Sequence, residues 1–263
     1  MTNNSIGFRL KFDDMKPEDI EKFLFNYLKI FNRFEIKVTK NLISSGGLEY
    51  VLSVSKKIAD GKYSIHLLKD ILTCKSSYED TIQIISKMKN LESTKKIMLI
   101  THLPFQITRE QIECIFQISK ILPQNCLLLL ENMLINKNNY EYLRKIDKLC
   151  LVLDEENIKN VGMCLDFGHM LFGFHKEGIK EKNVFLFLKK MPNMNSKIYE
   201  IHIHDYLERD HMQLQKGRTN FTDVSKFIKS NNLNVPIIIE TNVRDAKRDG
   251  IEQVKSLKNF LSV

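Results

Sequence analysis

The chain has 263 residues, 43% of them apolar, which is enough for one large hydrophobic core. The net charge is +8, but Lys is spread through the whole sequence. We therefore assign the charge mainly to solvated helix faces, with a small preference for an anionic ligand. No run reaches the ~18 apolar residues of a membrane helix, and residues 1–13 lack the pattern of a signal peptide. We expect one cytoplasmic domain over residues 1–263, without a membrane contact.

Eight short apolar runs, rich in Ile, Val, Leu or Phe, recur along the chain and end in polar residues. Runs this continuous are typical of strands that are buried on both faces, as in a parallel sheet. In chain order they are Ile6–Leu10, Phe34–Val38, Tyr63–Leu67, Ile97–His102, Cys126–Glu131, Val161–Asp166, Ile198–His204 and Val235–Glu240.

Helical patterns lie between these runs. Pro17 followed by two acids is typical of a first helical turn. Thr108 and Gln111 form a capping-box pattern before an apolar periodic stretch. Further helices are expected near residues 46–59, 78–91, 138–152, 181–190, 221–230 and 247–260.

The regular alternation predicts an α/β fold, a single (β/α)8 TIM barrel. Polar residues close six of the strands at intervals of 29 to 38 residues, which is one strand–helix unit each time. An open doubly wound sheet is the alternative, but no Gly-rich phosphate loop follows an early strand.

The cysteines do not indicate a disulfide framework or a cysteine zinc site. Their number is odd, their spacing is wide, and no CxxC pattern occurs. They are Cys74, Cys114, Cys126, Cys150 and Cys164, and most lie in apolar runs, as core residues do.

Six consecutive strands end in a side chain of metal-ligand type. In a barrel of this kind the carboxyl ends of the strands meet at one mouth. Carboxylates that lie close together repel one another unless a cation or protons neutralise them. With imidazoles, they suit Mn, Mg, Co or Zn. The six are His66, His102, Glu131, Asp166, His202 and Glu240.

In order and spacing, the motifs resemble those of the xylose isomerase-like barrel superfamily, which includes sugar isomerases, epimerases, dehydratases and endonuclease IV. The resemblance covers nearly the whole chain. The motifs are Leu-Leu-Glu131-Asn132, Cys-Leu-Asp166-Phe-Gly-His169, Ile-His202-Ile-His204-Asp205 and Ile-Ile-Glu240-Thr.

The resemblance implies a divalent metal held by Glu131, Asp166, His202 and Glu240. His169 would contact the substrate or a second metal. His66, His102, His204 and His211 are the further candidates for substrate binding.

The segment from His211 to Gly217 resembles a family loop, His-x-x-Leu-Gly-x-Gly, with Gln215 in place of its first glycine. Arg209 stands where the family has an aspartate. At the first strand, Arg9 could meet an anionic substrate or form a surface ion pair.

The resemblance favours a metal-dependent isomerase or epimerase that acts on a sugar, a sugar phosphate or a related hydroxy-ketone. Proton transfer would pass through a metal-stabilised enediolate, with Glu131 and Glu240 as acid and base and His169 on a substrate oxygen. A dehydratase or lyase would share the first step. The sequence is compatible with a homo-oligomer and carries no pattern that names the substrate.

Two alternatives stay open. The first is a hydrolase like endonuclease IV, which would use up to three zinc ions to cut DNA at abasic sites, and only this alternative implies a nucleic-acid partner. The second is a barrel that binds a ligand without catalysis. The altered sequence Arg209-Asp210-His211 counts against the hydrolase, because the family's Asp-x-His pair is broken there.

Overall fold

The computed structural model describes residues 4–13, 15–68, 71–72, 75–89, 95–134, 137–241 and 248–262. Eight parallel strands follow one another in chain order around a closed barrel, with helices between them. The predicted (β/α)8 fold is therefore confirmed. The strands are β1 Ile6–Leu10, β2 Arg33–Lys37, β3 Tyr63–His66, β4 Ile97–Leu103, β5 Cys126–Asn132, β6 Val161–Asp166, β7 Ile198–Ile203 and β8 Ile237–Ile239.

The predicted helices are present, with ends that differ by a few residues. They are α1 Pro17–Leu28, α3 Gly47–Ala59, α4 Lys75–Lys89, α5 Arg109–Ile121, α6 Asn139–Glu155, α8 Glu181–Leu188, α10 Phe221–Ser230 and α11 Arg248–Ser262. The capping box at Thr108 is confirmed, with both of its hydrogen bonds formed. Residues 90 and 91, the predicted end of the helix near 78–91, and residue 247, the predicted start of the last helix, lie outside the described residues.

Three helices were not predicted: α2 Lys40–Ser44, α7 Phe167–Lys176 and α9 Pro192–Ser196. Two of them have only five residues. In α7, the residues from Phe167 to Phe174 are all buried, and apart from His169 and two glycines they are apolar, so the segment was not separated from the apolar strand before it.

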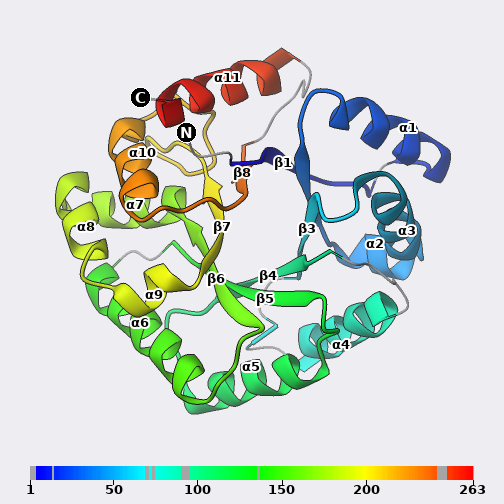
Figure 1. The fold of residues 1–263 in the computed structure, drawn as a ribbon, viewed down its shortest axis with the longest axis horizontal. Helices are drawn as coiled ribbons and strands as arrows, with labels where there is room; N and C mark the ends of the chain where they lie inside the picture. Colours follow the sequence, from blue (N-terminus) through cyan, green and yellow to red (C-terminus); the bar gives the residue numbers. More distant parts are fainter. Residues whose placement is uncertain are drawn as a thin grey trace. The chain divides into compact units, whose positions relative to one another are not determined.

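The chain divides into two compact units. The first comprises Met1–Phe8, Asn132–Asn157 and Met163–Val263. Within it, β6 pairs with β7, β7 with β8, and β8 with β1, all in parallel. Helices α7, α8 and α10 lie outside these strands (Figure 1). The register places Asp166 beside His202, so two predicted metal ligands are neighbours at the carboxyl ends of β6 and β7.

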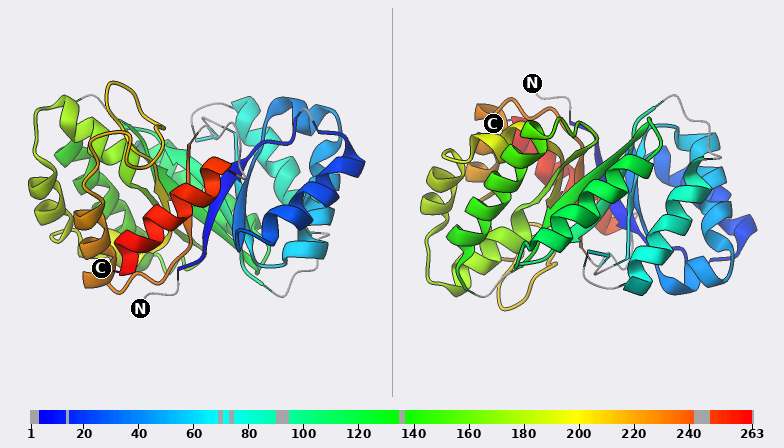
Figure 2. Two further views of the ribbon diagram at one scale, coloured as in Figure 1. Left: turned by 90° about the horizontal axis from the view of Figure 1, so that it is seen from above. Right: turned by 90° about the horizontal axis from the view of Figure 1, so that it is seen from below.

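The second unit comprises Arg9–Glu131 and Ile158–Gly162. Strand β3 pairs with β2 and β4, which sets His66 beside Lys37 and Ile100. Helices α1 and α3 pack against each other beside these strands (Figure 2). The rings of Phe34 and Tyr63 stack in the core with their centroids 5.9 Å apart.

The cysteines of the described residues behave as core side chains. Cys126, Cys150 and Cys164 are buried, and none of these is in a disulfide. Burial raises the pKa of the Cys126 and Cys150 thiols to about 12, so these thiols are poor metal ligands. Cys114 is partly exposed, and Cys74 lies outside the described residues.

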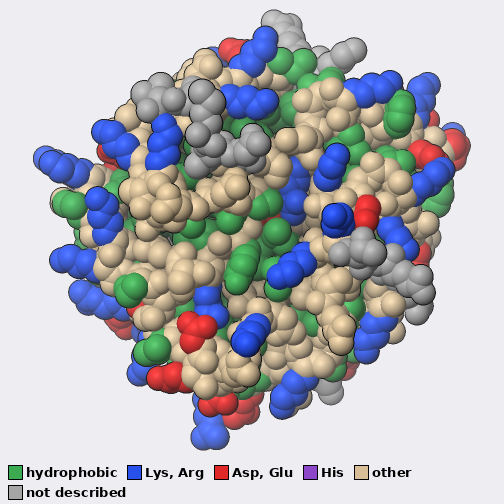
Figure 3. Space-filling view, viewed as in Figure 1, with side chains coloured by type: hydrophobic (Ala, Val, Ile, Leu, Met, Phe, Trp, Pro, Cys, Tyr) green, Lys and Arg blue, Asp and Glu red, His purple; other side chains and the backbone are tan. Residues whose placement is uncertain are grey.

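Lys and Arg side chains are scattered over the face in Figure 3 and do not gather in one block. This agrees with a charge carried by solvated helix faces. In the part of the chain that the structure describes, no helix is both long enough and apolar enough to cross a bilayer.

Candidate metal centre

Three predicted ligands converge in the first unit. Asp166 ends β6, His202 lies near the end of β7, and Glu240 follows β8. Each places a ligand atom within 4.8 Å of the others. The exposed fractions of the three side chains are 0%, 0% and 3%. Nδ1 of His202 lies 2.6 Å from Oε1 of Glu240. Because buried carboxylates this close need a cation or a proton, the donor set fits a divalent metal.

Hydrogen bonds to its backbone and to its carboxylate hold Asp166 in place. Its backbone N–H donates to the side-chain oxygen of Asn132 over 2.8 Å, and its carbonyl accepts from the Asn132 amide over 2.9 Å. One carboxylate oxygen caps α7 by accepting from the N–H of His169 at 2.7 Å. The strand-to-helix turn therefore fixes the direction of this carboxylate.

A further acid, which we did not predict, lies next to the imidazole of His202 on the same strand. Glu200 is fully buried, and its Oε1 lies 3.3 Å from Nε2 of His202. The available signal was the two-residue alternation of β7, which places Glu200, His202 and His204 on one side of the strand.

Three histidines form a second cluster in the same unit. Ligand atoms of His169, His204 and His211 lie within 4.8 Å of one another. Nδ1 of His169 is also 3.6 Å from Asp210. The cluster offers imidazole nitrogens and a nearby carboxylate, which are donors that zinc accepts.

The histidines of this cluster differ in their pKa. Burial opposes the charged form of His204, but Asp166 at 3.4 Å outweighs it, so the pKa of His204 is raised. Burial, together with the neighbouring His204 and His169, lowers the pKa of His211 to about 4. A neutral His211 keeps a lone pair for a metal or a substrate hydroxyl.

Gly168 gives the His204 ring its space. A Cβ at this position would lie 2.3 Å from ring atoms of His204, and that ring is fully buried, with the His169 and His211 rings against it. We expect Gly168→Ala to displace the imidazole and to lower the free energy of unfolding by roughly 1–3 kcal/mol. Urea unfolding measures the loss, and an unchanged midpoint would contradict this packing.

The loop after β7 is anchored by Asp205. Its carboxylate accepts hydrogen bonds from the backbone N–H groups of Tyr206, Gly217 and Thr219, at 2.7 to 2.9 Å. A β-bridge to Met212 closes the loop. The loop thus keeps a defined shape although Gln215 replaces a family glycine, and Gln215 adopts a left-handed φ of 66°.

In the second unit, the predicted substrate-binding residues His66 and His102 contact the predicted metal ligand Glu131. Nε2 of His66 lies 2.9 Å, and that of His102 3.3 Å, from the same oxygen of Glu131. Burial, and after it the positive charge of Arg9, lowers the pKa of His66 to about 4. A neutral imidazole is the form that binds metals, so these three side chains are also a candidate metal site.

Arg9 is part of this cluster. Its guanidinium pairs with the fully buried Glu35 and lies 3.8 Å from Glu131. The sequence allows either contact with an anionic substrate or a surface ion pair for Arg9. The structure shows an ion pair, but the side chain is largely buried. Glu35 was missed because it lies inside a strand.

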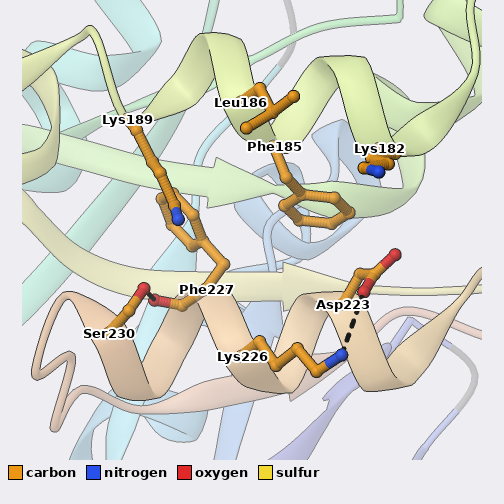
Figure 4. A pocket seen from close by; sticks show the side chains of 8 residues that line it. All are labelled: Lys182, Phe185, Leu186, Lys189, Asp223, Lys226, Phe227 and Ser230. Atoms are coloured by element: carbon orange, nitrogen blue, oxygen red, sulfur yellow. Dashed lines mark hydrogen bonds and ion pairs between the residues drawn. The ribbon is translucent and has the colours of Figure 1, made fainter.

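Two pockets lie in the first unit. One, of about 180 Å³, lies between α8 and α10, with the rings of Phe185 and Phe227 between the two helices and Leu186 also in its lining (Figure 4). It contains no candidate ligand. The other, of about 390 Å³, is lined by the loop after β7: Arg209, Asp210, His211, Met212, Gln213 and Lys216. The second pocket therefore adjoins the histidine cluster through His211.

Comparison with known proteins places the chain in a family. The family described as xylose isomerase-like TIM barrel matches residues 106–260. The chain belongs to this family. The resemblance of the motifs is thereby confirmed. No curated protein matches the sequence.

Solved structures share the fold of this xylose isomerase-like barrel over almost its whole length. AsfvAP:AG is 16% identical with a TM-score of 0.70, covering 98% of this chain and 99% of its own. The 3-keto-D-glucoside 4-epimerase YcjR from E. coli is 15% identical, with a TM-score of 0.67 and coverage of 98% and 100%. The D-psicose 3-epimerase from Clostridium cellulolyticum H10, solved with D-tagatose, is 12% identical, with a TM-score of 0.67 and coverage of 98% and 99%.

Proposed function

We propose that this xylose isomerase-like barrel is a divalent-metal-dependent isomerase or epimerase. Its substrate would be a sugar, a sugar phosphate or a related hydroxy-ketone. Asp166, His202, Glu240 and Glu131 would hold the metal. The observation that carries the proposal is the convergence of the first three, fully or almost fully buried, at the ends of adjacent strands.

We include Glu131 among the proposed metal ligands because of its position in the strand order. It lies near the end of β5, next in strand order to β6, which carries Asp166. Strand ends of a parallel barrel share one mouth. The sugar epimerases among the solved structures of this fold support a carbohydrate-like substrate.

A bound divalent cation would supply Lewis-acid polarisation of a carbonyl oxygen and would offset negative charge on the substrate. The side chains of Glu131 and Glu240 would take a proton from the substrate carbon and return one to it. Imidazole N–H groups of His169 and His204 would donate to substrate hydroxyls.

The pocket lined by the loop after β7 suits an anionic substituent. Arg209 and Lys216 are exposed at its edge, against a single acid, Asp210. Arginine and lysine bind phosphate through charge-assisted hydrogen bonds. We therefore place a sugar phosphate first among the candidate substrates.

Metal binding should stabilise the fold. A ligand that binds only the native state at 100 times its Kd adds about 2.7 kcal/mol. We expect Mn²⁺ or Zn²⁺ to raise the Tm of metal-free protein, and EDTA to reverse the rise. A Tm that no divalent cation changes would contradict the proposal.

A second candidate is a zinc-dependent hydrolase of abasic-site DNA. The observation that favours it is the pair of additional clusters, His66–His102–Glu131 and His169–His204–His211, each with ligand atoms within 4.8 Å. Together with the proposed central site, they could hold up to three zinc ions, and multi-metal sites are typical of phosphodiester hydrolysis.

Three measurements separate the candidates. Metal analysis should give one equivalent for the epimerase and two or three zinc ions for the hydrolase. The epimerase should catalyse solvent deuterium exchange into a ketose or its phosphate, and the hydrolase should cut an abasic-site duplex. Cleavage of the duplex that is lost in Glu240→Gln would overturn the epimerase proposal.

A further inference from the structure

Glu200 is a buried carboxylate to which the proposed chemistry gives no role. It lies inside β7, two residues before His202, and its side chain has no exposed surface. Its partner across the sheet is Cys164 on β6. Taking a carboxylate out of water costs several kcal/mol unless hydrogen bonds compensate, so a buried acid here needs a structural or functional reason.

The imidazole of His202 lies between two carboxylates. Nε2 is 3.3 Å from Oε1 of Glu200, and Nδ1 is 2.6 Å from Oε1 of Glu240. Glu200 lies within β7, whereas Glu240 follows the end of β8 and Asp166 ends β6, with a ligand atom of each within 4.8 Å of the other. The two ring nitrogens of His202 therefore face different surroundings: Nε2 faces the strand interior and Nδ1 faces the candidate ligands.

A neutral imidazole carries one N–H and one lone pair, and only the lone pair can bind a metal. An ionised carboxylate can accept a hydrogen bond but cannot donate one. Glu200 at Nε2 favours the tautomer with its proton on Nε2. Glu240 attracts the same proton to Nδ1 over 2.6 Å until a cation takes up its carboxylate, so a bound metal and Glu200 together would select the Nε2–H tautomer. In that tautomer the Nδ1 lone pair points at the candidate metal position.

We propose that Glu200 is a positioning residue, which fixes the tautomer and the ring orientation of His202 for metal binding through Nδ1. This rests on the proposed function, since it requires His202 to be a ligand. Carboxylates that orient metal-bound histidines in this way typically contribute 10- to 100-fold in metal affinity. The sulfur of the buried Cys164 also lies within 4.8 Å of the ligand atoms of Glu200 and His202.

The test is the affinity of metal-free protein for Mn²⁺ and for Zn²⁺, measured by calorimetric titration. We expect Glu200→Gln to weaken binding by about 10- to 100-fold, because an amide can turn its NH₂ group toward Nε2 and favour the other tautomer. The matched control is Glu208→Gln, which removes the same charge from an exposed position on the loop after β7. Its affinity should stay within about twofold of the unmodified protein.

The outcomes are distinguishable. If the unmodified protein binds neither metal, the proposed function fails. If the unmodified protein binds metal and Glu200→Gln binds equally well, or Glu208→Gln loses as much, only the role of Glu200 is overturned.

A second measurement does not depend on the folding of the variant. Nitrogen-15 NMR of the unmodified, zinc-loaded protein reports which ring nitrogen of His202 carries the proton, with His202→Asn used to assign its signals. A proton on Nε2 supports the role of Glu200. A proton on Nδ1 overturns it.

Discussion

Glu240→Gln is expected to reduce turnover by about 10³-fold, because one substitution removes both a proposed acid–base group and a metal ligand. General acid–base catalysis alone contributes 10²–10⁴-fold. The glutamine keeps the size of the side chain and its position beside Nδ1 of His202. The measurement is the rate of solvent deuterium exchange into the substrate, together with metal affinity by titration.

Glu156→Gln is the matched control, since Glu156 is exposed just after α6. It should leave both the rate and the metal affinity unchanged. A Glu240→Gln variant that keeps more than a tenth of the activity would contradict the role assigned to Glu240.

Asp205→Ala is expected to cost about 3–5 kcal/mol of folding free energy. The carboxylate of Asp205 is fully buried and accepts three backbone hydrogen bonds, and each buried donor left without an acceptor costs about 1–3 kcal/mol. The Tm should fall by roughly 10 °C. The loop from Tyr206 to Thr219, which carries His211, should lose protection from hydrogen exchange.

Asp205→Asn tests the same contacts more gently, because one oxygen acceptor remains. Its loss in urea unfolding should be less than half that of Asp205→Ala. A loss below about 1 kcal/mol in the alanine variant would show that the loop does not depend on this carboxylate.

The sequence was sufficient to predict the barrel because its strands are continuous apolar runs at nearly constant intervals. It was not sufficient for α7, whose side chains from Phe167 to Phe174 are all buried. A short, mostly apolar segment of this kind cannot be assigned to a helix by periodicity alone. The observed ends of several strands differ from the predicted ends by one or two residues. Strand β8, for example, begins at Ile237 and not at Val235.

Only those residues of the candidate site that lie at strand ends could be predicted. Asp166 and Glu240 are found by asking which polar residue closes each apolar run. Glu35 and Glu200 interrupt the interior of a strand, and their partners depend on register. Nothing in the sequence says that Arg9 pairs with Glu35 across 26 positions, because strand pairing has to be known first.

The most direct test of the proposed metal centre is an anomalous difference map from a crystal of the protein loaded with Mn²⁺. We expect the strongest peak within coordination distance of Asp166, His202 and Glu240, with Glu131 as the fourth ligand, and no peak there in His202→Ala. A map with no peak at these residues, or with a peak only among His169, His204 and His211, would contradict the central claim.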